Sequence, residues 1–318
     1  MVTQNDLYEL QYLATEFALK TSEHLFVTGK AGTGKTTFLH DIRKNTTKNT
    51  IVAAPTGVAA INAGGITLHS LFQLPFNAFL PTTQRVPAEF TNINTLFGNF
   101  KFGKAKLDLI KELELLIIDE VSMLRCDTLD AIDTILRTLR KNRNEPFGGV
   151  QLLLIGDLFQ LPPVVKEEEW ALLNDYYDTP FFFSAQVMKE SNFHNIEFSR
   201  IYRQSDEKFI RLLNKVRNNE MTEDDFDALH ERYQPELVTE LEDFITLSTH
   251  NVKVARINQQ QLQKLEGEAY EFKAFIEGDF YENSYPTEAN LVFKAGAQVM
   301  FIRNDSSAEK RFYNGKLA

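Results

Sequence analysis

Cysteine and long apolar runs are scarce in this chain of 318 residues. Cys126 is the single cysteine, which excludes an internal disulfide and any multi-cysteine zinc site. The six histidines are scattered, so no transition-metal site is visible either. No run of about 18 apolar residues occurs, and we therefore expect no membrane-spanning segment. With 43% hydrophobic and 25% charged residues, the composition is that of a globular protein, and the length suggests about two domains.

A targeting sequence is also missing. The first residues, MVTQNDLYELQY, have neither the basic nor the apolar region of a signal peptide. Together with the single cysteine, this favours an intracellular, reducing compartment. A cytoplasmic location in a bacterium is the simplest prediction, and a nuclear or mitochondrial location stays open as an alternative.

Positive charge is in short supply as well. The chain has 34 lysines and arginines against 44 aspartates and glutamates, for a net charge of −10. A nucleic-acid partner ordinarily favours the opposite balance. The acidic residues are unevenly distributed, however: residues 220–243 hold ten acidic side chains and one arginine. The rest of the chain is close to neutral and can present a local basic groove, so net charge does not decide the partner.

Short apolar segments alternate with amphipathic helices over the first two hundred residues. Buried strands are predicted at His24–Thr28, Thr50–Ala54, Leu115–Asp119 and Val150–Ile155. The clearest helices are Asp6–Lys20 and Asp127–Lys141, in which apolar residues recur at helical spacing. This alternation predicts an α/β fold with a doubly wound parallel sheet.

The pattern divides the chain into three parts. A first α/β domain is predicted over residues 1–185, with an insertion at about residues 72–106 that is rich in proline and phenylalanine. A second α/β domain is predicted over residues 186–290, with Asp243–Ser248 as its clearest strand. From Leu291 the sequence takes on β character, which continues to residue 318.

A phosphate-binding loop is the strongest chemical signal. Residues 29–36, GKAGTGKT, fit the pattern G-x-x-x-x-G-K-[ST], follow a predicted strand and open a predicted helix. Glycines at positions 29, 32 and 34 let the backbone approach the phosphates, with N–H groups directed inward at the helix N-terminus. Lys35 is expected to contact the β- and γ-phosphates, and the Thr36 hydroxyl to bind Mg²⁺.

Polar residues follow two further strands. Asp119 and Glu120 emerge at the carboxyl end of an apolar strand, where open α/β sheets bind ligands. Asp119 is predicted to hold Mg²⁺ and Glu120 to polarise the attacking water, which suits hydrolysis better than transfer to an acceptor. Gln160 could hydrogen-bond a γ-phosphate and report its loss. A strand-terminating turn is the alternative for residues 156–160, and Asp157 is interpreted as structural.

Small residues and hydroxyl groups gather at other strand ends. Ala54–Ala60 (APTGVAA) and Thr67–Ser70 (TLHS) offer N–H and O–H donors that backbone phosphates can approach. His69 could instead be a core histidine. Leu247–Asn251 (LSTHN) has the same character in the second half of the chain. Arg203 could act as an arginine finger or be an ordinary surface arginine.

At the end of the insertion, lysines alternate with aromatic rings. This arrangement suits base stacking beside a basic groove, and a satellite hydrophobic cluster with solvated lysines explains it equally well. The residues are Phe97, Phe100, Lys101, Phe102, Lys104 and Lys106.

Taken in order, these blocks resemble the petite-integration-frequency (PIF) family of DNA helicases, which belongs to superfamily 1 and is related to RecD-type helicases. The matching blocks are TGKAGTGKT, APTGVAA, TLHS, LLIIDEVSML and IYRQ. The most specific stretch runs from Asp127 to Val164 and includes EPFGGVQLLLIGDLFQLPPV, residues 145–164. The resemblance covers nearly the whole chain, most specifically residues 24–204.

The resemblance implies two RecA-like domains and ATP-driven 5′-to-3′ translocation on single-stranded DNA, with unwinding of duplex DNA. ATP and Mg²⁺ would be the cofactors, and single-stranded, forked or G-quadruplex DNA the partners. No membrane partner is implied, and we expect a monomer.

By matching position, the resemblance also assigns roles to residues. The nucleotide would be held by Gln11, Gly29, Gly32, Thr33, Gly34, Lys35, Thr36 and Thr37, with Gln11 recognising adenine. Thr36 and Asp119 would hold the metal. The catalytic residues would be Lys35, Glu120, Gln160 and Arg203, the last as an arginine finger. The DNA-binding residues would be Thr56, Gly57, Val58, Thr67, His69, Thr249, His250 and Asn251.

The family's later motifs do not occur before Ala318. These are a glutamine–glycine block that touches DNA and a closing block with a second arginine finger. We therefore expect an incomplete second RecA-like domain, with residues 291–318 as the start of a small β-barrel insertion. Two alternatives to a helicase stay open: a module that binds ATP and single-stranded DNA without productive motion, and a P-loop kinase. Asp119, Glu120 and Gln160 argue against the kinase because they suit attack by water.

Overall fold

The structure is a computed structural model that falls into two compact units, Met1–Glu207 and Lys208–Ala318. It describes residues 4–318 apart from 99–101, 203–205, 236–245, 277–286, 303–304, 306, 308, 310 and 313–315. Among these residues, no helix is both long and apolar enough to cross a lipid bilayer.

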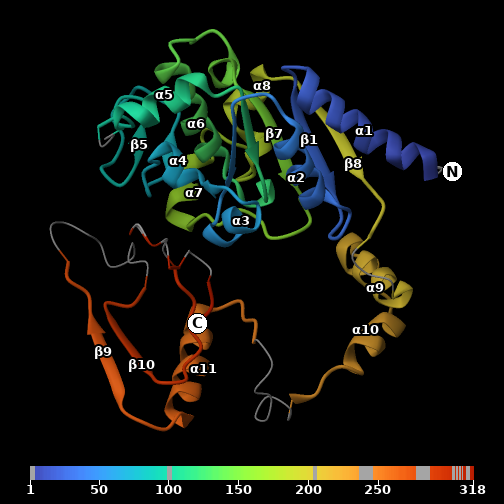
Figure 1. The fold of residues 1–318 in the computed structure, drawn as a ribbon, viewed down its shortest axis with the longest axis vertical. Helices are drawn as coiled ribbons and strands as arrows, with labels where there is room; N and C mark the ends of the chain where they lie inside the picture. The colour runs from blue at the N-terminus through green and yellow to red at the C-terminus, as the bar shows by residue number, and fades with distance from the viewer. Residues whose placement is uncertain are drawn as a thin grey trace. The chain divides into compact units, whose positions relative to one another are not determined.

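A six-stranded parallel sheet forms the centre of the first unit, with the strand order β3-β2-β6-β7-β1-β8 (Figure 1). The strands are β1 (His24–Gly29), β2 (Thr50–Ala54), β3 (Ile66–Thr67), β6 (Leu115–Ile118), β7 (Gln151–Gly156) and β8 (Phe193–Phe198). Every residue of β6 and β7 is buried, as a central strand covered on both faces requires. The predicted α/β fold with a parallel sheet is confirmed.

Helices cover both faces of this sheet (Figure 1). They are α1 (Gln4–Lys20), α2 (Lys35–Asn45), α3 (Gly57–Asn62), α4 (Leu68–Phe72), α5 (Lys104–Glu112), α6 (Cys126–Leu139), α7 (Glu167–Leu173) and α8 (Gln186–Glu190). Alternate residues of a strand point to opposite faces, so Leu115 and Ile117 pack with α1 and α2, whereas Leu116 and Ile118 pack with α6. The sheet therefore separates two hydrophobic clusters.

The predicted insertion packs on the core of the first unit. It contains the short strands β4 (Phe79–Leu80) and β5 (Thr91–Asn92), which pair in parallel, and the start of α5. Phe79 is fully buried in the same cluster as α6, and Phe97 and Phe102 pack against that cluster from outside. This favours the hydrophobic-cluster interpretation of those two phenylalanines. Phe100 and Lys101 lie outside the described residues.

Three buried aspartates on one face of α6 hold distant segments in place. Asp127 accepts a hydrogen bond from the backbone N–H of Phe79 at 2.9 Å, and Asp133 accepts one from that of Phe147 at 2.6 Å. Asp130 accepts three, from the N–H groups of Gln186 (2.9 Å) and Val187 (3.0 Å) and from the hydroxyl of Tyr177 (2.9 Å). Residues three apart on a helix share a face, so a single helix anchors the insertion, the turn before β7 and the start of α8.

Arg125 completes this arrangement at the N-terminus of α6. Its guanidinium makes two hydrogen bonds with Asp127, at 2.8 and 2.9 Å, and one with Glu169 of α7 at 2.7 Å. Both carboxylates raise the pKa of Arg125, against the effect of its burial. The result is a paired, hydrogen-bonded buried charge, which is the form in which charges are tolerated in a protein interior.

The first unit extends beyond residue 185, where the sequence analysis ended the first domain. Strand β8 pairs in parallel with β1 from His24↔Phe193 to Gly29↔Phe198, and therefore belongs to the same sheet. The predicted boundary at residues 185–186 is wrong for that reason, and the structural units divide between Glu207 and Lys208. The sequence of β8, FHNIEF, has only two buried positions because it lies at the sheet edge.

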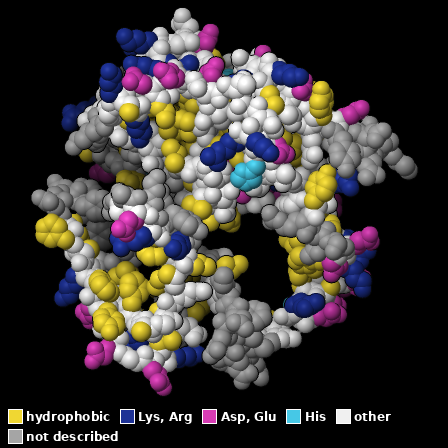
Figure 2. Space-filling view, in the orientation of Figure 1, with side chains coloured by type: hydrophobic (Ala, Val, Ile, Leu, Met, Phe, Trp, Pro, Cys, Tyr) yellow, Lys and Arg dark blue, Asp and Glu magenta, His cyan; other side chains and the backbone are white. Residues whose placement is uncertain are grey.

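The second unit has the helices α9 (Glu207–Asn218, whose first residue closes the first unit), α10 (Glu223–His230) and α11 (Asn251–Lys264). Strands β9 (Ala269–Lys273) and β10 (Asn290–Lys294) pair antiparallel. None of the described residues after 207 is buried, and hydrophobic side chains lie at the surface over α9, β9 and β10 (Figure 2). Strand β10 and the antiparallel bridge between Met300 and Leu317 agree with the β character predicted from Leu291, whereas β9 lies within the predicted second α/β domain.

The strand predicted at Asp243–Ser248 is not observed where it can be examined. Residues 243–245 lie outside the described part of the chain, and residues 246–248 are not in a strand. Leu247 is 90% exposed, which is the opposite of the burial that the apolar pattern predicted.

The aspartates of α6 lead to a prediction on stability. Asp130→Ala leaves three buried donors without an acceptor, so we expect the free energy of unfolding to fall by about 3 kcal/mol. Denaturation in urea, followed by circular dichroism, measures the change. The matched control is Asp41→Ala on the exposed side of α2, which should stay within about 0.5 kcal/mol of the wild type. Equal effects of both substitutions would contradict the anchoring role of Asp130.

Candidate nucleotide and nucleic-acid site

Three adjacent parallel strands bring the predicted chemistry to one edge of the sheet. β6, β7 and β1 are neighbours in the sheet, and the polar residues follow each strand at its carboxyl end. Thr28 of β1 pairs with Gly156 of β7, and Ile118 of β6 pairs with Leu154 of β7. The loop after Gly29, the Asp119–Glu120 pair and the segment 157–160 therefore lie side by side.

The loop of residues 29–34 wraps around the N-terminus of α2. Gly32 and Gly34 have φ values of 78° and 88°, a left-handed conformation that glycine adopts without strain. Thr33 is buried, and its hydroxyl donates to the carbonyl oxygen of Lys30 at 2.8 Å. The ammonium of Lys35 donates to the carbonyl oxygens of Gly29 (2.6 Å) and Lys30 (3.0 Å). A positive charge thus lies within the loop that precedes the N-terminus of α2, which is an anion-binding arrangement.

Gly29 is required by close approach of the backbone. Its φ is 155°, and a Cβ atom at this position would lie 2.3 Å from the carbonyl oxygen of Phe198 and 2.8 Å from the hydroxyl oxygen of Thr33. The backbone of strand β8 therefore lies in direct contact with the start of the loop. The exposed Thr36 and Thr37 lie in the first turn of α2, close to Lys35 in sequence.

Asp119 and Glu120 form a partly buried acidic pair. Burial raises the pKa of Asp119, and the N–H of Glu120, which donates to Asp119 Oδ1 at 2.9 Å, and the charge of Lys35 oppose that shift. Burial also raises the pKa of Glu120, with smaller contributions from the charges of Asp119 and Asp157. Glu120 has a φ of 50°, a strained conformation for a glutamate that is often found at functional sites.

Asp157 shapes the segment that carries Gln160. The buried carboxylate accepts hydrogen bonds from the N–H of Phe159 at 3.1 Å and from the side-chain amide of Gln160 at 3.3 Å. The N–H of Gln160 donates to the carbonyl oxygen of Asp157 at 2.9 Å. These contacts agree with the structural role predicted for Asp157, and they place the exposed Gln160 at the same sheet edge as Lys35 and Glu120.

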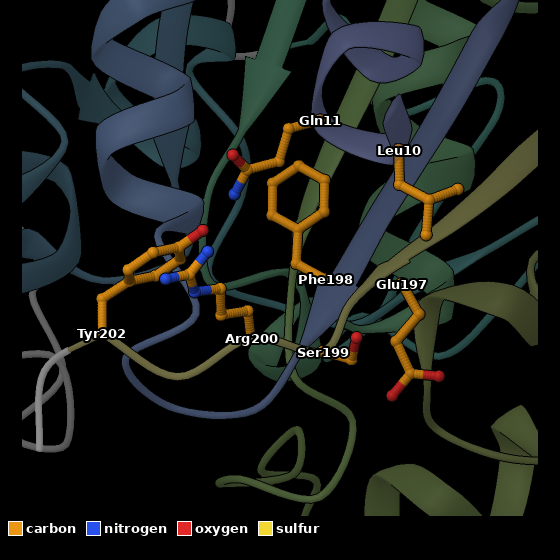
Figure 3. Close-up of a pocket in the computed structure, with 7 residues that line it drawn as sticks. All are labelled: Leu10, Gln11, Glu197, Phe198, Ser199, Arg200 and Tyr202. Carbon is orange, nitrogen blue, oxygen red and sulfur yellow. The ribbon is translucent and has the colours of Figure 1, made fainter. Parts of the chain in front are cut away.

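A small pocket lies beside the loop (Figure 3). It is lined by Leu10, Gln11, Glu197, Phe198, Ser199, Arg200 and Tyr202. The Gln11 amide points toward Tyr202, and its Nε2 atom lies 3.6 Å from the position that a Cβ on Gly34 would take. The structure therefore places Gln11 near the phosphate-binding loop, and its contact with adenine stays a prediction.

Tyr202 is a site residue that sequence reasoning missed. Its N–H donates to the carbonyl oxygen of Gly32 at 2.7 Å, and the guanidinium of Arg200 lies 5.0 Å from the centre of its ring. Tyr202 stands next to Arg203 in the IYRQ block, and an aromatic ring beside a predicted arginine finger was the available signal. Arg203 itself lies outside the described residues.

The predicted DNA-binding residues of the first unit lie at the ends of β2 and β3. The hydroxyl oxygen of Thr56 accepts the N–H of Ala59 at the start of α3, and that of Thr67 accepts the N–H of Ser70 at the start of α4. Each threonine is thus a helix N-cap whose own hydroxyl hydrogen can still donate. The neighbouring residues Gly57, Val58 and His69 complete the set, and the Val58 side chain is exposed.

The predicted DNA-binding residues of the second unit gather at the N-terminus of α11. The Thr249 hydroxyl and His250 Nδ1 are 2.8 Å apart, His250 is the N-cap, and Asn251 is the first helical residue. All three residues are exposed. Within the described part of the chain, no group of three or more His, Cys, Asp and Glu side chains could enclose a metal ion.

Comparison with known proteins identifies the family. The model of the PIF1-like helicase family matches residues 3–226, which is more than half of the chain. The chain belongs to the PIF1-like helicase family. The ATP-dependent DNA helicase PIF1 of Saccharomyces cerevisiae is 32% identical over 303 residues, which are 90% of this chain and 32% of the yeast protein. The Pif1 helicase of Psychrobacter is 32% identical over 91% of this chain and 43% of its own length.

Solved structures of PIF1-like helicases share this fold. A Bacteroides Pif1 bound to single-stranded DNA has a TM-score of 0.82 and is 42% identical, with all of this chain and 68% of that one covered. The Bacteroides enzyme in complex with ADP-AlF3 and single-stranded DNA has a TM-score of 0.83 at 42% identity, with 100% and 69% covered. The chain thus spans 32% and 43% of the length of the two curated relatives named above.

The close approach at Gly29 can be tested by substitution. Gly29→Ala places a methyl group against backbone atoms of Phe198, so we expect the free energy of unfolding to fall by about 2 kcal/mol or more and nucleotide binding to weaken. Gly103→Ala is the matched control, because Gly103 has a φ of −66° and nothing lies within 4 Å of its added Cβ. Thermal unfolding and titration with a fluorescent ATP analogue compare the two variants. A Gly29→Ala protein that matches the control would contradict the observed approach.

Proposed function

We propose that this chain is the motor core of a DNA helicase that hydrolyses ATP, moves 5′ to 3′ along single-stranded DNA and unwinds duplex, forked or G-quadruplex DNA. The observation that carries the proposal is the convergence of Lys35, the Asp119–Glu120 pair and Gln160 at one sheet edge. Membership of the PIF1-like family supports it, and relatives are named ATP-dependent DNA helicases.

ATP would bind across the loop and the pocket beside it. The loop glycines and the N-terminus of α2 would receive the phosphates, with Lys35 neutralising the β- and γ-phosphates. Thr33 holds the loop conformation through its bond with Lys30, and Thr37 follows in the first helical turn. Gln11 in the adjoining pocket would contact the adenine.

Mg²⁺ fits the oxygen groups at this edge. Asp119 is a mostly buried carboxylate whose pKa is raised by burial, so a nearby cation would stabilise its charged form. Asp119 and the Thr36 hydroxyl would hold the ion, and both offer the hard oxygen ligands that Mg²⁺ prefers. When bound, the ion would neutralise charge that develops on the phosphates.

Hydrolysis requires a base beside the γ-phosphate. Glu120 would accept a proton from the attacking water, and its raised pKa brings it closer to the operating pH of a general base. Gln160, positioned by Asp157, would hydrogen-bond the γ-phosphate and lose that contact on hydrolysis. Arg203 would supply a further positive charge, as an arginine finger does.

Single-stranded DNA is the partner that the exposed donors suit. The N-cap threonines Thr56 and Thr67, with Gly57, Val58 and His69, would contact one stretch of the strand from the first unit. On the second unit, Thr249, His250 and Asn251 would contact single-stranded DNA. We propose that the chain acts as a monomer.

A second candidate is a module that binds ATP and single-stranded DNA without unwinding. It is favoured by the second unit, in which no described residue is buried. Movement along DNA requires two domains that change their arrangement during hydrolysis, and each domain then needs a stable core.

ATP hydrolysis with and without single-stranded DNA tests the proposal. We expect turnover that DNA stimulates and that Lys35→Ala reduces to background. Glu120→Gln should keep nucleotide affinity while turnover falls by roughly 10²- to 10⁴-fold. Binding of both ligands without turnover would support the second candidate, and absence of nucleotide binding would overturn both.

The pH dependence of turnover follows from the acidic pair. Glu120 and Asp119 act in their ionised forms, and burial raises the pKa of each. Carboxyl groups with ordinary pKa values near about 4 would lose their charge only around that pH. As the pH falls, activity should therefore begin to decline at a higher pH than such groups would give. A profile of kcat/KM for ATP between about pH 4.5 and 8 measures this limb, because kcat/KM reports the groups of the protein without bound nucleotide and Mg²⁺. A flat profile down to pH 4.5 would contradict the raised pKa values.

A further inference from the structure

Phe76 differs in its surroundings from the other phenylalanines of the insertion that the structure describes. Phe72 and Phe79 are fully buried, and Phe97 and Phe102 pack against the core, whereas the Phe76 side chain is 76% exposed. Packing in the first unit therefore does not explain its aromatic ring. The exposed ring offers a flat apolar surface that a ligand with an aromatic face can cover.

The Phe76 ring is supported from one side by His69. The two ring centres are 5.9 Å apart, and the planes differ by 16°, which is an offset stacked arrangement. His69 is half-buried in α4, and burial, aided by the charge of Arg125, lowers the pKa of its imidazole. The imidazole thus backs one side of the phenyl ring, most of whose surface stays open to solvent.

Donors for phosphate lie beside the same short helix, one on α5 and one at the N-cap of α4. The ammonium of Lys106 donates to the carbonyl oxygen of Ser70, the residue after His69, at 2.5 Å. The same ammonium lies 5.2 Å from the centre of the Phe102 ring. Thr67, the N-cap of α4, precedes His69 by two residues. A flat apolar surface beside a cation and a hydroxyl donor is the combination that single-stranded nucleic acids recognise.

We propose that Phe76, backed by His69, is a stacking platform for an unpaired base of single-stranded DNA, with Lys106 beside the adjoining phosphate. This rests on the proposed function and adds to it a residue and a mode of recognition. Bases inside a duplex have both faces covered by their neighbours, so the platform selects a single strand whatever its sequence.

Removal of the ring tests the platform. Binding of a labelled thymidine oligonucleotide is compared with that of an abasic oligonucleotide of equal length, by fluorescence anisotropy on the full chain. Phe76→Ala should weaken binding of the thymidine strand by roughly 5- to 100-fold, as expected for loss of one stacked base. Binding of the abasic strand should not change, because it has no base to stack.

Two further variants separate stacking from hydrophobicity and charge. Phe76→Tyr keeps an aromatic ring and should retain affinity for the thymidine strand. Phe76→Leu keeps an apolar side chain but has no flat ring, so its affinity should fall as that of Phe76→Ala does. Lys106→Ala should weaken both strands and reduce the slope of log affinity against log salt by about 1. Phe76→Ala should leave that slope as in the wild type. Nucleotide binding by each variant checks that the first unit is intact.

The outcomes distinguish this inference from the function on which it rests. A wild-type chain that binds neither oligonucleotide overturns both. A wild-type chain that binds single-stranded DNA, with Phe76→Ala unchanged on the thymidine strand or equally weakened on both strands, overturns the platform alone.

Discussion

The parallel register of β6, β7 and β1 is the constraint on which the candidate site depends. Because Thr28 pairs with Gly156 and Ile118 with Leu154, the three loops that carry Lys35, Glu120 and Gln160 begin at nearly the same height. A slip of one residue would turn every side chain of a strand to the opposite face. The side chains of β6 and β7 fill a separate cluster on each face, so a slip would exchange the side chains that each cluster contains and would disturb the packing of both.

Helix α6 extends this constraint to the rest of the first unit. The helix lies at the centre of the stretch from Asp127 to Val164 that most resembles the family, and its three buried aspartates explain what that stretch does physically. Its carboxylates accept hydrogen bonds from backbone N–H groups of three segments: the insertion, the turn before β7 and the start of α8. Burial raises the pKa of Asp130 to about 6, so these contacts are made at the expense of desolvating a carboxylate.

The sequence predicted the parts of the fold that local pattern determines. β1, β2, β6 and β7 are apolar runs, and the loop at residues 29–36 has a spacing that few other structures use, so both were predictable. β8 was not predicted because this edge strand buries only Ile196 and Phe198 and so lacks a clear apolar pattern. The strand predicted at Asp243–Ser248 was wrong where it can be examined because an apolar run need not be buried. Tyr202 and the Phe76–His69 pair depend on contacts between separate segments, which a single sequence does not contain.

The claim that these strand ends form one ATP site is tested most directly by a crystal structure of the chain with ADP, aluminium fluoride and Mg²⁺. The account predicts that the fluoride group lies between Lys35, Glu120 and Gln160, that the metal contacts Thr36 and Asp119 directly or through water, and that the adenine lies beside Gln11. A nucleotide bound elsewhere, or phosphates out of reach of Lys35, would contradict it.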